Sequence, residues 1–225
     1  MKMKKRLKGM GVRLCAGWLS VLLLCGGASV SAQETEKKQV AMSYTAKAAY
    51  LMEQDTGAVL FEQNATQALA PASLTKLMDL LLIYEAMEEG RLKPDETLTC
   101  SAYAKSMGGS EIWLKEGEQM TVEELLKALI VVSANDAAVV FAEAIATTEQ
   151  AFVEQMNEKG RELGLVNTHF VNATGFDEEG HYTCAQDVAA IARELMTRYG
   201  DEITRFSTIW MDSLRGGETE LVNTN

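Results

Sequence analysis

Residues 71–78 read Pro-Ala-Ser-Leu-Thr-Lys-Leu-Met, and they open the apolar segment around which the fold is expected to form. Apolar side chains then recur at the spacing of one helical face, at Leu74, Leu77, Met78, Leu81 and Leu82. The pattern stops at Gly90, a residue type that commonly follows the last turn of a helix. The stretch therefore predicts a core helix that begins soon after Pro71.

Ser73 and Lys76 lie three residues apart at the start of this helix, so the hydroxyl and the amine project from neighbouring positions on one face. An unprotonated Lys76 amine can take the Ser73 proton if burial or a nearby cation lowers the lysine pKa from about 10.4. The helix N-terminus also stabilises negative charge nearby. Alone, the Ser-x-x-Lys spacing is a weak signal, because chance produces it readily in a chain of this composition.

A second polar element interrupts a pair of apolar helices. Thr121 and Glu124 form a capping box before a helix that runs towards Val132, and an Ala-rich helix covers residues 137–146. Ser133-Ala134-Asn135-Asp136 lies between them. The Ser133 hydroxyl could relay protons, and the Asn135 amide could hold a substrate carbonyl. Simple helix capping is the more economical explanation when this segment is taken alone.

Other elements follow from turn and cap signals. A β-hairpin is expected for residues 48–53 and 58–62 and another for 207–214 and 218–223, each around a glycine-containing turn. A helix is expected over about 149–163. A further helix is expected from Thr183, with Gln186 completing its capping box, to about Tyr199.

Residues 71–78 together with Ser133-Ala134-Asn135 resemble the first two motifs of the penicillin-recognising serine enzymes. Three further stretches are similar to the low-molecular-weight D-alanyl-D-alanine carboxypeptidases: GSEIWL at 109–114, MNEK at 156–159 and THFVN at 168–172. The resemblance extends over about residues 46–225. It implies an α/β fold of the α+β type, similar to β-lactamases and transpeptidases, in which an antiparallel sheet packs against a helical cluster.

The resemblance also implies an activity, the removal of the terminal D-alanine from peptidoglycan stem peptides through an acyl-enzyme. By the match, Ser73 is the nucleophile, Lys76 the general base and Ser133 a further catalytic residue. Asn135 and Ser110 are the expected substrate-binding residues. β-Lactams are the expected covalent inhibitors, and neither a metal nor a cofactor is implied.

The sequence departs from the family pattern in two places. Asp79 stands where Thr is expected, one turn beyond Lys76; an ion pair would raise the Lys76 pKa, but we expect Asp79 to face solvent. The second departure is that no Lys-Thr-Gly triplet occurs, and the family's strand would follow shortly after Asn225. We therefore expect a domain over 48–225 that is incomplete at its C-terminus, with weak or absent turnover.

The N-terminus is typical of a secretory signal peptide. Basic residues precede the apolar run 14–25, and small residues end at Ala32, the expected cleavage site. An uncleaved amphipathic anchor is the alternative. Residues 33–47 are expected to be a flexible lead-in. The enzyme is thus expected outside the cytoplasm, in the periplasm or cell wall. The outer face of the membrane is an alternative location, although no anchor is expected in this chain.

The net charge restricts the class of binding partner, and the cysteine content bears on disulfide formation. The formal net charge is −11, which argues against nucleic acid as a partner. Cys15 and Cys25 fall within the predicted signal peptide. Cys100 and Cys184 remain, and we expect two separate thiols rather than a disulfide.

Three other functions share some features with this sequence. A Ser-His-Asp hydrolase lacks a Gly-x-Ser-x-Gly motif, and His169 and His181 are expected to be surface histidines, although a metal pair with nearby aspartates is conceivable. A class A β-lactamase needs a deacylating Glu, and residues 162–167 miss that motif by one residue. A non-catalytic cell-wall-binding protein would have little need for a nucleophile beside its base.

Overall fold

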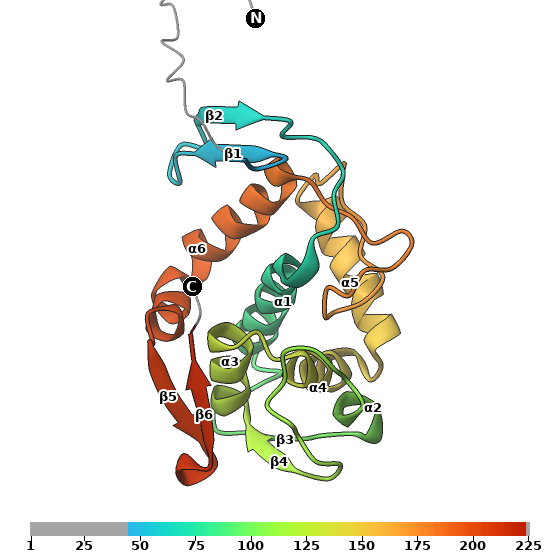
Figure 1. Ribbon diagram of the computed structural model, residues 1–225, viewed down its shortest axis with the longest axis vertical. Helices are drawn as coiled ribbons and strands as arrows, with labels where there is room; N and C mark the ends of the chain where they lie inside the picture. The colour runs from blue at the N-terminus through green and yellow to red at the C-terminus, as the bar shows by residue number, and fades with distance from the viewer. Residues whose placement is uncertain (1–44, 224–225) are drawn as a thin grey trace, which may run out of the picture. The chain divides into compact units, whose positions relative to one another are not determined.

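The computed structural model describes residues 45–223, and its central element is helix α1 (Lys76–Glu88), preceded by the 3-10 turn η1 (Ala72–Thr75). Nine of the 13 residues of α1 are buried. Helix α6 (Ala185–Ser207) lies on one side of α1 and α5 (Glu149–Glu162) on the other, and α4 (Asn135–Ala146) also packs against α1 (Figure 1). A helix enclosed by neighbours in this way can be apolar on nearly all faces. The predicted core helix is confirmed.

Helices α3 (Val122–Val131) and α4 (Asn135–Ala146) meet at the predicted polar corner. Thr121 caps α3: its hydroxyl accepts from the Glu124 N–H, and the Glu124 carboxylate accepts from the Thr121 N–H at 3.1 Å. This reciprocal arrangement satisfies backbone donors that a helix start would otherwise leave free. The predicted capping box and the break between the two helices are therefore confirmed.

The remaining helices are α2 (Ala102–Lys105), α5 (Glu149–Glu162) and α6 (Ala185–Ser207). The predicted capping box at Thr183 is wrong, because Cys184 is the N-cap and its Sγ accepts from the Asp187 N–H at 3.4 Å. The first straight stretch of α6 ends at Tyr199, where the end of the helix was predicted. The helix kinks there (φ −130°, ψ 22°) and continues to Ser207, since Ile203 and Phe206 still have core to cover.

Across residues 45–223, six short strands form three separate antiparallel pairs. Strands β1 (Ala49–Met52) and β2 (Val59–Gln63) form the first predicted hairpin, with Tyr50 opposite Glu62. Strands β5 (Met211–Leu214) and β6 (Thr219–Val222) form the second, whose first strand starts later than predicted because α6 extends to Ser207 and β5 begins only at Met211. Strands β3 (Thr97–Thr99) and β4 (Gln119–Thr121) were not predicted, since three residues are too few to show alternation.

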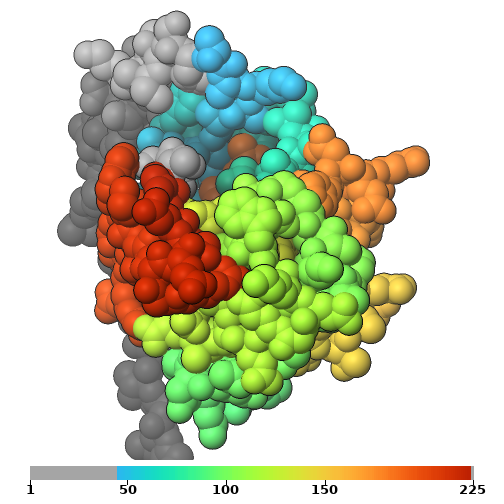
Figure 2. Space-filling model, turned by 60° about the horizontal axis from the view of Figure 1, so that its bottom comes forward, coloured from blue at the N-terminus to red at the C-terminus, as the bar shows by residue number. Residues whose placement is uncertain are grey.

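The core lies between the helices. Its largest fully buried side chains include Phe141, Phe152, Phe170, Met78 and Leu81. The β5–β6 hairpin, red in Figure 2, lies against green parts of the chain, and β6 contacts α3. Cys100 and Cys184 are both buried and unbridged, as predicted. Within residues 45–223, no helix combines the length and the apolar character that a membrane crossing needs. The predicted signal peptide and most of the predicted lead-in lie outside the described residues.

Candidate active site

Ser73 and Lys76 lie together at the junction of η1 and α1, as their spacing predicted. The Lys76 Nζ lies 3.4 Å from Ser73 Oγ. Ser73 is exposed, whereas only 4% of Lys76 is accessible to solvent. The preceding residue, Ala72, has φ 47°, a left-handed conformation that costs free energy for any residue with a side chain. The turn thus presents a hydroxyl to solvent with a buried amine beside it.

The Lys76 amine has two further partners, and both are acceptors. Nζ donates to Asn135 Oδ1 at 2.7 Å and to the Thr174 carbonyl oxygen at 2.7 Å. Burial lowers the Lys76 pKa to about 8, partly opposed by the carboxyl of Asp79. A neutral amine keeps two N–H bonds, which these two acceptors can take. Its lone pair is then directed to the Ser73 hydroxyl, the arrangement a general base needs.

Asn135 links the base to the segment that carries Ser110. Its Nδ2 donates to the Gly108 carbonyl at 2.7 Å, while its backbone N–H donates to the Ser110 carbonyl at 2.7 Å. One N–H of the Asn135 amide remains for another acceptor, since a side-chain amide has two donors. Helix α4 therefore brings Asn135 to Lys76, and the 108–110 segment lies against both.

Ser133 and Ser110 lie at the edge of this group. Ser133 has φ 57° in the corner between α3 and α4 and is partly exposed, and Ser110 is exposed. Backbone strain of this kind persists only where the surrounding structure enforces it, and it tends to collect at functional sites. Two of the strained positions, Ala72 and Ser133, fall at or beside predicted site residues.

Asp79 is not where we expected it, because it is fully buried instead of facing solvent. It lies on a helix that neighbours enclose. Neither of its carboxylate oxygens has a hydrogen-bond partner among residues 45–223. Burial raises the Asp79 pKa well above 3.8; the positive charge of Lys76 opposes this rise and the carboxylate of Glu149 adds to it. Asp79 is therefore a buried carboxyl held towards its neutral form, one turn of helix beyond Lys76.

Sequence reasoning missed three contributors to the site. Thr174 supplies the carbonyl that accepts from Lys76. Gly175 (φ 87°) lets that loop approach, since a Cβ built there would lie 2.0 Å from the Ala72 carbonyl oxygen. Asp136 is buried and accepts from the N–H groups of Ile112 and Leu114, which fixes the segment after Ser110. Asp136 belongs to the segment predicted to cap a helix, but the sequence did not reveal its partners, and nothing in the sequence pattern singled out Thr174 or Gly175.

The residues considered for the alternative functions are placed elsewhere. His169 is exposed as predicted, but His181 is buried, and its partner is the hydroxyl of Thr75 rather than that of Ser73. Glu162 pairs with Lys159 at 2.6 Å on the surface of α5. In the part of the chain that the structure describes, no three His, Cys, Asp or Glu side chains converge as metal ligands would.

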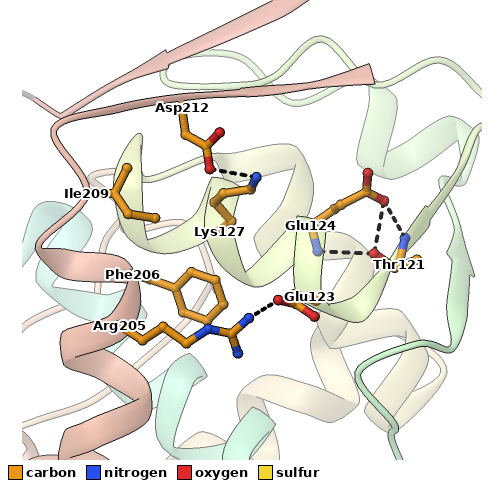
Figure 3. A pocket seen from close by; sticks show the side chains of 8 residues that line it. All are labelled: Thr121, Glu123, Glu124, Lys127, Arg205, Phe206, Ile209 and Asp212. Carbon is orange, nitrogen blue, oxygen red and sulfur yellow. Dashed lines mark hydrogen bonds and ion pairs between the residues drawn. The ribbon is translucent and has the colours of Figure 1, made fainter. Parts of the chain in front are cut away.

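A separate hollow of about 540 Å³ lies between α3, the end of α6 and β5 (Figure 3). Its charged side chains are already paired: Lys127 Nζ donates to Asp212 at 2.8 Å, and Arg205 pairs with Glu123. None of the predicted site residues lines it. This hollow is therefore distinct from the Ser73 site.

An exposed serine at the start of a buried helix, with a desolvated lysine one turn on and a Ser-x-Asn corner opposite, defines the class of serine acyl-transfer enzymes that use a lysine base. The family model described as D-alanyl-D-alanine carboxypeptidase matches residues 32–225, and the chain belongs to that family. D-alanyl-D-alanine carboxypeptidase DacF of Bacillus subtilis is 45% identical over 210 residues, which are 92% of this chain and 54% of DacF. The chain thus spans about half the length of this relative.

Solved structures support the same assignment. D-alanyl-D-alanine carboxypeptidase DacD from Francisella tularensis superposes with a TM-score of 0.76 at 32% identity, covering 82% of this chain and 45% of that one. Penicillin-binding protein D2 from Listeria monocytogenes, solved in an ampicillin-bound form, has a TM-score of 0.69 at 28% identity, covering 83% and 75%. The predicted fold class is confirmed.

Proposed function

We propose that this protein is an exported serine-type D-Ala-D-Ala carboxypeptidase acting on peptidoglycan stem peptides. The observation that carries the proposal is the Lys76 amine, which has two acceptors for its N–H bonds and the Ser73 hydroxyl as its third neighbour. The family assignment and the names of the relatives support the substrate class. The signal-like N-terminus supports a location where peptidoglycan is found.

The reaction begins when Ser73 Oγ attacks the carbonyl carbon of the penultimate D-alanine and its proton passes to Lys76 Nζ. The peptide C–N bond then breaks, and the leaving amine takes a proton from Lys76 through the Ser133 hydroxyl. Terminal D-alanine departs, and an ester remains on Ser73. Water attacks this ester while Lys76 takes its proton, and the proton returns to Ser73 as the peptide leaves.

Substrate binding is assigned to Asn135 and Ser110. The free N–H of the Asn135 amide can donate to a peptide carbonyl. The 108–110 segment provides a wall beside it, held in place by Asn135 itself. A β-lactam would meet the same nucleophile, and its ring amide would open to leave a stable ester on Ser73. The ampicillin-bound relative supports this class of inhibitor.

The test measures two events on the purified 225-residue chain. A fluorescent penicillin reports acylation, and D-alanine release from a peptide ending in D-Ala-D-Ala reports turnover. We expect labelling of the wild type and none of Ser73→Ala, with Ser106→Ala, another exposed serine, as the matched control that keeps its label. Labelling that survives Ser73→Ala would overturn the proposal. Labelling without D-alanine release would reduce the function to penicillin binding.

A further inference from the structure

His181 is a buried histidine that the reaction above does not use. Only 4% of its surface is accessible, and both ring nitrogens have partners. Nε2 lies 2.8 Å from Thr75 Oγ1, and Nδ1 accepts from the Val171 N–H at 3.0 Å. Because a backbone N–H can only donate, Nδ1 must carry a lone pair, and the ring proton must be on Nε2. The ring is therefore a neutral imidazole in one tautomer, and it donates to Thr75.

The two partners of His181 belong to the two sides of the active site. Thr75 lies between the nucleophile Ser73 and the base Lys76 on the chain. Val171 begins the loop that carries Thr174, whose carbonyl accepts from the Lys76 amine. The imidazole thus connects the turn that presents the nucleophile to the loop that orients the base. Close by in the chain, Leu69, which precedes that turn, and Thr183, which follows His181, exchange backbone hydrogen bonds of 2.8 and 2.9 Å.

Protonation would break this connection. An imidazolium carries a proton on both nitrogens, so Nδ1–H would face the Val171 N–H and two donors would oppose each other. Burial lowers the His181 pKa from 6.5; the charges of Glu178 and Asp177 oppose this and that of His169 adds to it. Thr75, which contacts the ring from the start of α1, carries no charge. The neutral ring is thus favoured at neutral pH and lost in acid.

We propose that His181 is a positioning residue whose neutral Nε2–H tautomer holds Thr75 against the 171–174 loop, so that Ser73 and Lys76 keep the geometry needed for acylation. The proposal rests on the proposed acylation of Ser73. Acid then acts twice on the enzyme: it protonates the base, and it opens the contact that places the base beside the nucleophile.

The first arm of the test measures the rate of Ser73 labelling by a fluorescent penicillin from about pH 8 down to about pH 5. We expect the wild-type logarithmic rate to fall about one unit per pH unit at first, and about two units once His181 also protonates. His181→Asn keeps an acceptor for Val171 but reaches no hydroxyl, so its rate should be about three- to tenfold lower with a slope of one throughout. His169→Gln, which removes the other histidine, should keep the steep limb.

The second arm reads the imidazole nitrogens by NMR in the wild type, and it does not depend on any variant folding. We expect His181 to show a bare Nδ1 and a protonated Nε2, with a titration midpoint that coincides with the steep limb. An Nδ1–H tautomer, or a steep limb retained in His181→Asn, would overturn the proposal. Absence of Ser73-dependent labelling at every pH would instead overturn the proposed function, and the tautomer and titration would then decide alone whether His181 holds the loop.

Discussion

Burial of the Lys76 amine favours the neutral form that the proposed reaction needs, and the two acceptors beside it still receive its N–H bonds. Its pKa of about 8 places the neutral form within reach near neutral pH. We expect the acylation rate to rise about tenfold per pH unit just below about pH 8, above the range in which His181 protonates, and to level off at higher pH. Stopped-flow or time-resolved labelling across that range checks this. A rate independent of pH there would exclude Lys76 as the base.

Asp79 makes a separate prediction about stability. The pKa of Asp79 is raised in the folded state, so its contribution to the free energy of unfolding is fully present below about pH 3.8. This contribution is lost as the pH rises towards the folded-state pKa. Asp79→Asn has nearly the same shape and does not titrate. Its free energy of unfolding should therefore exceed that of the wild type by an amount that is small near pH 3.8 and grows with rising pH. Urea unfolding at several pH values measures the difference, and a gap that shrinks with pH would contradict it.

At the scale of elements, the loop that carries Thr174 and Gly175 packs closely against the turn that carries Ser73. A Cβ at Gly175 would lie 2.0 Å from the Ala72 carbonyl oxygen, and the residue has φ 87°. Gly175→Ala should lower the free energy of unfolding by at least about 1–3 kcal/mol. It should also lower the acylation rate, because the loop must shift and the Thr174 carbonyl then moves away from the Lys76 amine. Gly164→Ala shares a positive φ (72°) but has open space, so it should lose stability alone.

The elements that the sequence predicted are those with local signals. The core helix, the Thr121–Glu124 capping box and the two hairpins each depend on residues close in the chain, and all are present. The continuation of α6 past Tyr199 depends on distant core that Ile203 and Phe206 cover, which no local pattern reveals. The pairing of β3 with β4 likewise joins short segments separated by α2.

The candidate site likewise contains residues that a local sequence pattern revealed and groups that no local pattern revealed. Motif spacing brought Ser73, Lys76, Ser133 and Asn135 to attention, and the structure places Asn135 on the Lys76 amine. The Thr174 carbonyl could not be predicted, because a backbone oxygen leaves no mark in the sequence. Asp79 was predicted on the wrong side of its helix, since a charged residue is rarely fully buried without a partner.

At the scale of the whole described molecule, Arg215 ties the β5–β6 hairpin to the segment beyond Ser110. Its guanidinium pairs with Glu118 at 2.6 Å and donates to the Ile112 carbonyl at 3.0 Å. Both side chains are about four-fifths buried. Arg215→Ala should lower the free energy of unfolding by about 3 kcal/mol, because it leaves a buried carboxylate without its partner.

Arg91 provides the matched control for that measurement. It pairs with Glu89 at the same distance of 2.6 Å, but both side chains are about half exposed. Surface pairs of this kind contribute roughly 0–1 kcal/mol, so Arg91→Ala should change the stability little. Equal losses for the two variants in chemical unfolding would show that the hairpin is not held by Arg215.

Ser73 is the proposed nucleophile and Lys76 its proposed activating base, and mass spectrometry of the intact chain after exposure to a penicillin shows whether Ser73 is acylated. We predict a single covalent adduct of the antibiotic's mass, mapped by proteolysis to the peptide that contains Ser73. The adduct should be absent from Ser73→Ala and formed far more slowly in Lys76→Met. An adduct on another residue, or an unmodified wild-type chain under conditions in which a known penicillin-binding protein is fully acylated, would contradict the claim.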